Sequence, residues 1–174
     1  SYNKALTIKP DYVEAYNNMG NALKEQGKLD EAIEVYKESL SIRPDYAETY
    51  NNMGNALQGQ GKLNEAIQAY KKALTVKPDY ATAFNNMGNA FKAQGELDGA
   101  IEAYNEALTI KPNYVEAFNN MGNALQEQGK LDKAIQAYQK SLAINPNYAN
   151  AFWNLAGTAE DVTEAKKWVQ QCLL

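Results

Sequence analysis

The chain has 174 residues, 45% of them hydrophobic, and a formal net charge of -4, a composition that excludes collagen-like and disordered proteins. The acidic balance argues against partners such as nucleic acid or an anionic membrane surface, which bind clustered lysine and arginine. No apolar run approaches the roughly 18 residues that a membrane span needs.

Histidine is absent and Cys172 is the single cysteine, so the usual ligands of zinc, copper and haem are missing. Histidine is also the most common general base in enzymes. We therefore predict a protein that is not an enzyme and holds no metal or cofactor. The chain begins at Ser1 in the middle of a motif and without an initiator methionine, so we read it as a piece of a longer protein whose targeting signals are not visible in it. We expect a cytoplasmic location.

Proline recurs every 34 residues, which indicates an internal repeat. The five positions are Pro10, Pro44, Pro78, Pro112 and Pro146. The same period predicts four complete units, at residues 13–46, 47–80, 81–114 and 115–148, within a single array spanning 1–174. Residues 1–12 are expected to be the C-terminal half of a truncated unit. Residues 149–174 are expected to be an atypical terminal repeat, because the turn glycine is missing there.

Each unit opens with apolar residues at helical spacing. In the first unit Met19, Gly20 and Leu23 fall within about 60° of Tyr16 when each residue adds about 100°. The pattern predicts an amphipathic helix. A residue type that often caps helix N-termini precedes it in every unit, and these candidate caps are Asp11, Asp45, Asp79, Asn113 and Asn147.

A second amphipathic helix follows in each unit, because Ala32, Tyr36 and Leu40 share one face. Its candidate caps are Asp30, Asn64, Asp98, Asp132 and Thr163. A glycine supplies the turn between the two helices, at Gly27, Gly61, Gly95 and Gly129. Gly20 and its equivalents lie inside the first helix, where glycine costs roughly 1 kcal/mol relative to alanine. This recurring cost predicts a close approach between the paired helices.

The motif Tyr16-x2-Met19-Gly20-x2-Leu23, followed by Ala32-x3-Tyr36 and a proline, resembles the tetratricopeptide repeat family. The resemblance covers essentially the whole chain. It implies an all-α fold, an open right-handed superhelical solenoid of antiparallel helix pairs whose first helices line the concave face. It also implies a scaffold for protein–protein interaction.

Each first helix carries three asparagines. Asn17, Asn18 and Asn21 lie between about 100° and 200° from Tyr16, so we expect them to share one solvent-exposed face. The equivalents are Asn51, Asn52 and Asn55, then Asn85, Asn86 and Asn89, then Asn119, Asn120 and Asn123, with Asn154 in the last unit. An amide offers donors and an acceptor, which complement the backbone of an extended peptide.

These rows resemble those in the repeat region of O-linked N-acetylglucosamine transferases, where asparagines hold substrate peptides. By that resemblance the best-matched row is Asn18, Asn52, Asn86, Asn120 and Asn154. The alternative is that the amides bond between neighbouring helices or were copied by duplication. The asparagine nearest the apolar stripe is the best candidate for such a structural role.

The charges near the groove predict the chemistry of the ligand. Glu14, Glu48 and Glu116 have the spacing of helix-capping boxes and also make the groove edge acidic, which favours a neutral or basic peptide. Lys24 and Lys92 are the only basic candidates, so we predict no clamp for a C-terminal carboxylate.

Two other roles stay open, a homo-oligomer formed by end-to-end stacking and the substrate-recruiting arm of a larger transferase. Two tryptophans, Trp153 and Trp168, fall outside the repeating aromatic slots. We expect them to pack around the shortened last turn, with a binding anchor as the alternative.

Overall fold

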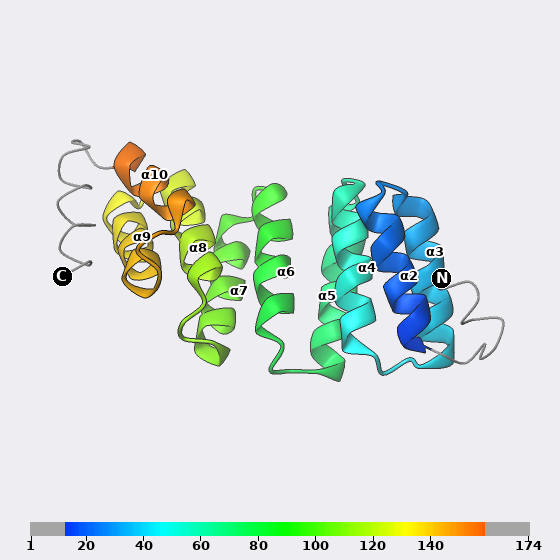
Figure 1. Cartoon of the computed structure of the whole chain (residues 1–174). Helices are drawn as coiled ribbons and strands as arrows, with labels where there is room; N and C mark the ends of the chain where they lie inside the picture. The colour runs from blue at the N-terminus through cyan, green and yellow to red at the C-terminus, as the bar shows by residue number, and fades with distance from the viewer. Residues whose placement is uncertain (1–12, 159–174) are drawn as a thin grey trace. The chain divides into compact units, whose positions relative to one another are not determined.

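The computed structural model describes residues 13–158, and within them every regular element is an α-helix (Figure 1). Several predictions lie outside these residues and stay predictions. They concern the half-unit at 1–12, the caps Asp11 and Thr163, the residues Trp168 and Cys172, and the end of the terminal repeat.

The predicted helix pairs are confirmed. The first helices are α2 (Val13–Glu25), α4 (Ala47–Gly59), α6 (Ala81–Ala93) and α8 (Val115–Glu127). The second helices are α3 (Leu29–Ile42), α5 (Leu63–Val76), α7 (Leu97–Ile110) and α9 (Leu131–Ile144), and α10 (Ala149–Thr158) follows. The second helices end just before the prolines, whose ring excludes helical continuation.

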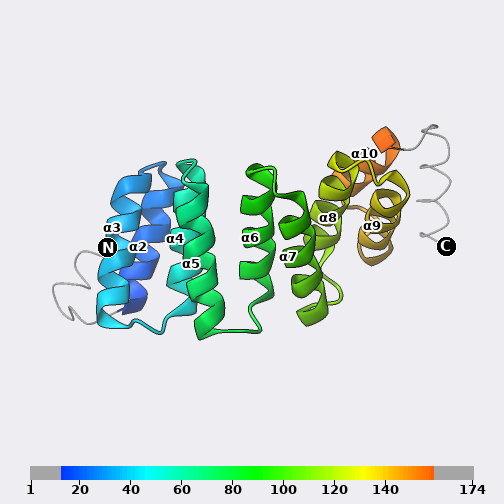
Figure 2. The same ribbon diagram turned by 180° about the vertical axis from the view of Figure 1, so that it is seen from behind.

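The chain divides into two compact units, residues 1–90 and residues 91–174. In unit 1, α2 packs against α3, α4 packs against α5, and α4 also contacts α3 (Figure 2). In unit 2, α8 packs against both α7 and α9, and α10 packs against α9. A first helix such as α4 or α8 therefore contacts its own second helix and the second helix of the preceding repeat.

The glycine turn is confirmed, and it has the geometry of a Schellman motif. The N–H of Gly27 donates to the carbonyl of Lys24 at 2.9 Å, and the N–H of Lys28 donates to the carbonyl of Leu23 at 3.0 Å. Gly27 has a φ of 75°, and Gly61, Gly95 and Gly129 have values of 74°, 79° and 74°. Only glycine adopts this left-handed conformation without steric cost.

The predicted helix N-caps are wrong by one or two positions. The cap of α3 is Lys28, so Asp30 lies inside the first turn, and the cap of α4 is Tyr46, so Asp45 lies one residue outside. Neither cap side chain bonds to its helix. The other described candidates shift in the same way: Asn64, Asp98 and Asp132 lie inside α5, α7 and α9, whereas Asp79, Asn113 and Asn147 lie two residues before α6, α8 and α10. Negative side chains near a helix N-terminus still interact favourably with its dipole.

Tyrosine rings fill the space between paired helices, as the repeating slots predict. Tyr36, Tyr70, Tyr104 and Tyr138 are fully buried. A Cβ atom built on Gly54 would lie 2.5 Å from Cε1 of Tyr70, and Gly20 and Gly122 face Tyr36 and Tyr138 in the same way. The predicted close approach is confirmed, and the group that approaches the glycine is the tyrosine ring.

Candidate functional site

The three asparagines of each first helix occupy different environments, so the prediction of one shared solvent face is wrong. The inner row, defined as Asn17, Asn51, Asn85 and Asn119, is only 7%, 4%, 5% and 4% exposed. The Oδ1 atom of Asn17 accepts hydrogen bonds from Thr49 Oγ1 at 3.2 Å and from Asn52 Nδ2 at 3.1 Å. These amides satisfy polar atoms between repeats, as expected for the asparagine nearest the apolar stripe.

A second set of asparagines receives the hydroxyls of the buried tyrosines. Tyr36, Tyr70 and Tyr138 donate to the Oδ1 atoms of the tyrosine-bound row, Asn21, Asn55 and Asn123, at 2.7, 2.8 and 2.9 Å. Asn89 stands at the equivalent position in α6. Burial raises the pKa of Tyr138 to about 12, which keeps its hydroxyl protonated and able to donate at neutral pH.

The outer row consists of Asn18, Asn52, Asn86, Asn120 and Asn154, and none of its members is buried. Asn18 is exposed and the others are half-buried. Asn52 Nδ2 donates to Asn17 Oδ1 at 3.1 Å and Asn86 Nδ2 donates to Asn51 Oδ1 at 3.0 Å. The nitrogen of each of these amides is therefore bound to the inner row of the preceding repeat.

Unit 2 repeats this arrangement at α10, the last helix among the described residues. Asn154 Nδ2 donates to Asn119 Oδ1 and to Asn123 Oδ1, both at 2.9 Å. In unit 1, the Oδ1 atom of Asn86 has no donor among the described residues. Asn52, Asn86 and Asn154 are thus held through their nitrogen. The oxygens of Asn52 and Asn120 each accept a long hydrogen bond of 3.5 Å from the inner row, whereas the oxygen of Asn86 can accept a hydrogen bond from a ligand.

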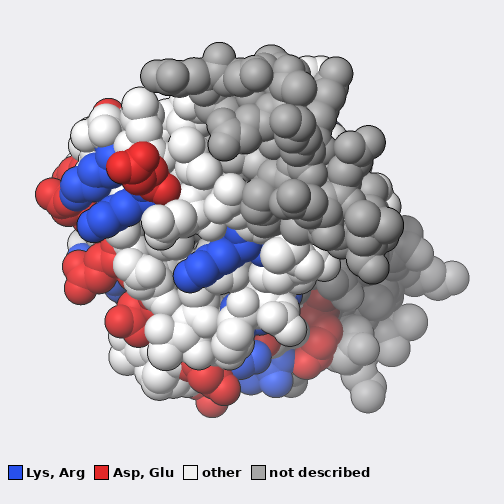
Figure 3. Space-filling view, turned by 90° about the vertical axis from the view of Figure 1, so that its left-hand side faces the viewer, with Lys and Arg blue, Asp and Glu red and all other residues white. Residues whose placement is uncertain are grey.

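The acidic residues at the groove edge are partly neutralised by basic residues of the same repeat. Glu14 lies 2.6 Å from Arg43 and Glu48 lies 3.7 Å from Lys77, whereas Glu116 is exposed. A backbone hydrogen bond and the Arg43 guanidinium hold the pKa of Glu14 below its ordinary value. Of the two basic candidates, Lys92 is 3.3 Å from Glu127. These ion pairs make the edge less acidic than the sequence predicts. Basic and acidic side chains are also intermixed on the α10 side of the molecule (Figure 3).

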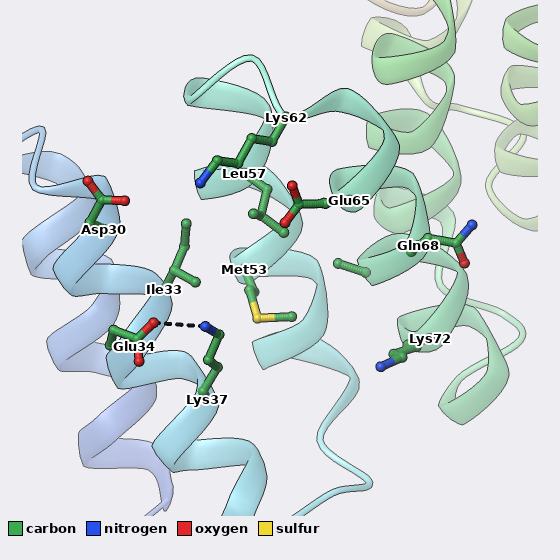
Figure 4. Close-up of a pocket in the computed structure, with 11 residues that line it drawn as sticks. Asp30, Ile33, Glu34, Lys37, Met53, Leu57, Lys62, Glu65, Gln68 and Lys72 are labelled. Carbon is green, nitrogen blue, oxygen red and sulfur yellow. Dashed lines mark hydrogen bonds and ion pairs between the residues drawn. The ribbon is translucent and has the colours of Figure 1, made fainter.

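A groove that sequence reasoning missed lies between the second helices of neighbouring repeats. In unit 1 it runs between α3 and α5 over Met53 and Leu57 of α4, with a volume of about 310 Å³ (Figure 4). Unit 2 has a groove of about 350 Å³ between α7 and α9, over Met121 and Leu125 of α8. The recurring methionine and leucine of the repeat motif could have indicated this groove. The sequence pattern, however, places them only in the apolar stripe of the first helix and does not show that they line a groove between second helices.

Trp153 differs from the expectation of packing around the last turn. Its side chain is 69% exposed, and its ring meets that of Phe152 edge-on at a centroid distance of 5.4 Å. Trp153 takes the slot that Asn119 holds one repeat earlier. The expectation of packing is therefore wrong for most of its surface.

Residues 13–158 contain no group of three or more histidine, cysteine, aspartate or glutamate residues that could hold a metal ion. Within the same range, no helix is both long enough and apolar enough to cross a membrane.

The sequence matches a family model described as TPR repeat at residues 1–27, 20–61, 59–95 and 88–129, and one described as Tetratricopeptide repeat at residues 115–148. The fold and these matches define a helix-pair scaffold of the kind that takes part in protein interaction. The chain belongs to the tetratricopeptide repeat family, which confirms the predicted family and all-α solenoid fold class. The division into repeats stays a prediction.

Solved structures of the same fold agree with this assignment. The chain is similar to MamA, with 30% identity, coverage of 85% of this chain and 86% of that one, and a TM-score of 0.76. YrrB, described as a TPR protein with an unusual peptide-binding site, is 22% identical over 99% of this chain and 92% of that one, with a TM-score of 0.74. PilF of Pseudomonas aeruginosa is 22% identical over 92% of this chain and 72% of that one, with a TM-score of 0.80. No curated protein sequence matches the chain.

Proposed function

We propose that the chain is a non-catalytic scaffold that binds an extended segment of a partner protein along the outer asparagine row. The observation that carries this proposal is the repeated bond from an outer amide to the inner row, seen at Asn52, Asn86 and Asn154. A half-buried amide that is already oriented loses less side-chain entropy when a ligand binds.

The orientation of these amides favours the main chain of a peptide as the ligand. The nitrogen of Asn86 already donates one of its two hydrogens to Asn51, whereas its carbonyl oxygen accepts from no described donor, so the oxygen is the group most open to N–H donors of a ligand. A peptide in an extended conformation presents such donors at regular intervals along its backbone. The inner and tyrosine-bound rows hold the outer row in place, and their part in binding is indirect.

The partner that fits this surface is neutral or basic. Lysine and arginine side chains are donors without an acceptor, so they suit carbonyl oxygens. The partly neutralised edge makes this charge preference weak, and main-chain contact is the dominant interaction. The structure of YrrB, a TPR protein with an unusual peptide-binding site, supports the capacity of this fold to hold a peptide.

The test starts from a displayed library of random peptides selected on the wild-type chain. One selected peptide is then titrated against the wild type, against N52A/N86A in unit 1 and against N120A/N154A in unit 2. Two lost hydrogen bonds at about 0.5–1.5 kcal/mol each weaken binding by about 5-fold to 150-fold. The matched control is E38A/K71A, which changes two exposed residues of α3 and α5.

Helicity measured by circular dichroism should be the same for all variants. A peptide that binds both asparagine variants as tightly as the wild type contradicts the proposal. Equal weakening by the E38A/K71A control also contradicts it, because that result places the peptide on the second helices.

A second candidate function is self-assembly, which the exposed ring of Trp153 favours. Trp153 occupies the position that Asn119 and Asn17 hold in earlier repeats. In the first repeat, Asn17 is contacted by Asn52 of the following repeat, so this position normally lies against the next repeat. The exposed indole therefore offers a surface to a second copy. Sedimentation over a range of concentrations tests this function: W153S should abolish any dimer, and a strict wild-type monomer refutes it.

A further inference from the structure

The two grooves on the second helices have the same apolar floor. Isoleucine, methionine, leucine and alanine recur 68 residues apart, as Ile33, Met53, Leu57 and Ala69 in unit 1 and as Ile101, Met121, Leu125 and Ala137 in unit 2. Figure 4 shows Ile33, Met53 and Leu57 between the charged side chains of the unit 1 rim. Both volumes are at the lower end of the range for ligand pockets, roughly 300–1,000 Å³.

The rims of the grooves differ in charge. Unit 1 has three lysines, Lys37, Lys62 and Lys72, against three acids, Asp30, Glu34 and Glu65, so its rim is neutral. Unit 2 has three lysines, Lys130, Lys133 and Lys140, against the single acid Asp98, which leaves a charge of +2. Lys133 in place of Glu65 raises the rim charge by two, and Asn105 in place of Lys37 lowers it by one. The remaining difference arises because Glu102, the equivalent of Glu34, is not among the residues that line the unit 2 groove.

The charged groups of unit 1 also satisfy one another to a greater extent. Lys37 Nζ lies 2.8 Å from Glu34, as Figure 4 shows. In unit 2, Lys130 and Lys133 are exposed and form no ion pair within the described part of the chain. Asp98 accepts a hydrogen bond from Gln128 at 2.8 Å, as Asp30 does from Gln60, so this bond is common to both grooves. The basic charge of the unit 2 rim is therefore not neutralised by its own groove.

We propose that the groove of unit 2 binds an acidic amphipathic helix of a partner protein. The rim residues Lys130, Lys133 and Lys140 follow α9 over 10 residues, about 15 Å or three helical turns. Apolar side chains at positions i, i+4 and i+7 of a docked helix contact Ile101, Met121 and Leu125, and acidic side chains beside them face the lysines. The charges supply specificity and a faster association rate.

This binding surface is separate from the outer asparagine row. Taking about 100° per residue, Met121 and Leu125 point about 100° and about 140° away from the outer-row residue Asn120 on α8. The two surfaces favour partners of opposite charge. The proposal therefore does not depend on the proposed function, and either can fail alone.

The four methionines of the chain allow a direct test, because Met53 and Met121 lie in the two grooves and Met19 and Met87 occupy the same slot of other repeats. With methionine methyl groups labelled with carbon-13, each groove has its own NMR signal. The probe is a synthetic helical peptide of about four turns, with leucine at i, i+4 and i+7 and glutamate beside them. Its control peptide carries lysine instead of glutamate.

We expect the glutamate peptide to shift the Met121 signal at concentrations that leave the Met53 signal nearly unchanged, and the lysine peptide to shift neither. K130E/K133E should weaken binding by about tenfold or more, whereas K62E, the unit 1 equivalent of the first change, should have no effect. K37N/E65K gives the unit 1 rim the two residues of unit 2, and the Met53 signal should then respond. Circular dichroism checks that these exposed substitutions preserve the fold.

Three results overturn the proposal. The first is an equal response of Met53 and Met121 in the wild type. The second is unchanged affinity of K130E/K133E. The third is a Met121 signal that moves with protein concentration in the absence of peptide, because a second copy of the chain then occupies the groove.

Discussion

Replacement of Gly122 by alanine tests the packing of a tyrosine ring on a helical glycine. A Cβ atom on Gly122 would lie 2.7 Å from Cδ1 of Tyr138 and still nearer to Cε1. Carbon atoms prefer a separation of about 3.5–4.0 Å, so the ring has to withdraw by about 1 Å. The ring is fully buried, and its hydroxyl donates to Asn123 and Gln126, both at 2.9 Å.

The expected cost combines several effects of known size. Overpacking costs about 1–3 kcal/mol, and distortion of the tyrosine hydrogen bonds adds about 0.5–1.5 kcal/mol. Alanine is favoured over glycine in a helix by about 1 kcal/mol, which offsets part of this cost. We expect G122A to lower the free energy of unfolding by about 2 kcal/mol.

Gly99 in α7 is the matched control in the same unit. A Cβ atom there would lie 3.4 Å from Cγ of Phe91, at the short end of ordinary van der Waals contact. G99A therefore gains the helix preference of alanine, and we expect it to stabilise the chain by up to about 1 kcal/mol. Urea unfolding followed by circular dichroism measures both variants, with a repeat-by-repeat fit because arrays can unfold in parts. A G122A variant as stable as G99A refutes the packing argument.

Three further predictions concern the buried Asn51, the buried Tyr138 and the half-buried Glu14. The N51A variant removes the acceptor of Asn86 and should lower the free energy of unfolding by about 1 kcal/mol more than N52A does. Urea titrations measure both variants. Equal effects contradict the assignment of Asn51 to a buried structural row and Asn52 to the outer row. Because burial raises the pKa of Tyr138 from 10.0 to about 12, its stabilisation is complete below pH 10 and is lost as the pH rises toward 12. Tyrosinate absorbance and helicity should change together in an alkaline titration, and Y138F should remove this contribution. The pKa of Glu14 is lowered from 4.5, so its stabilisation is present above that pH and is lost in acid. An acid titration of E14Q should lack this loss, and a profile identical to the wild type contradicts it.

The sequence predicts the fold well because each local signal recurs with the same period. The turn glycine shows this at Gly27, where left-handed backbone geometry requires the residue that the sequence places there. The tyrosine slot is equally clear, because Tyr36 and its equivalents are fully buried. The caps fail because Asp30 lies one residue inside α3, and a spacing pattern does not fix helix ends to within one residue.

The candidate site is predicted less well, because a helical wheel treats each helix alone. Asn17 lies about 100° from Tyr16 on the wheel, which indicates a polar face. In the stacked array this side meets Thr49 and Asn52 of the next repeat, so Asn17 is buried. Contacts between residues about 34 positions apart are not contained in the periodicity of one helix. The groove over Met53 escapes prediction for the same reason.

The most direct test of main-chain recognition is a thermodynamic cycle between the ligand backbone and the Asn86 carbonyl. One selected peptide and analogues with single N-methylated amides are titrated calorimetrically into the wild type and N86A. If Asn86 accepts from a peptide N–H, methylation of that one amide should weaken binding to the wild type by about 2-fold to 13-fold and have little effect on N86A. If every methylation weakens binding to both proteins by the same factor, the outer row does not recognise the backbone.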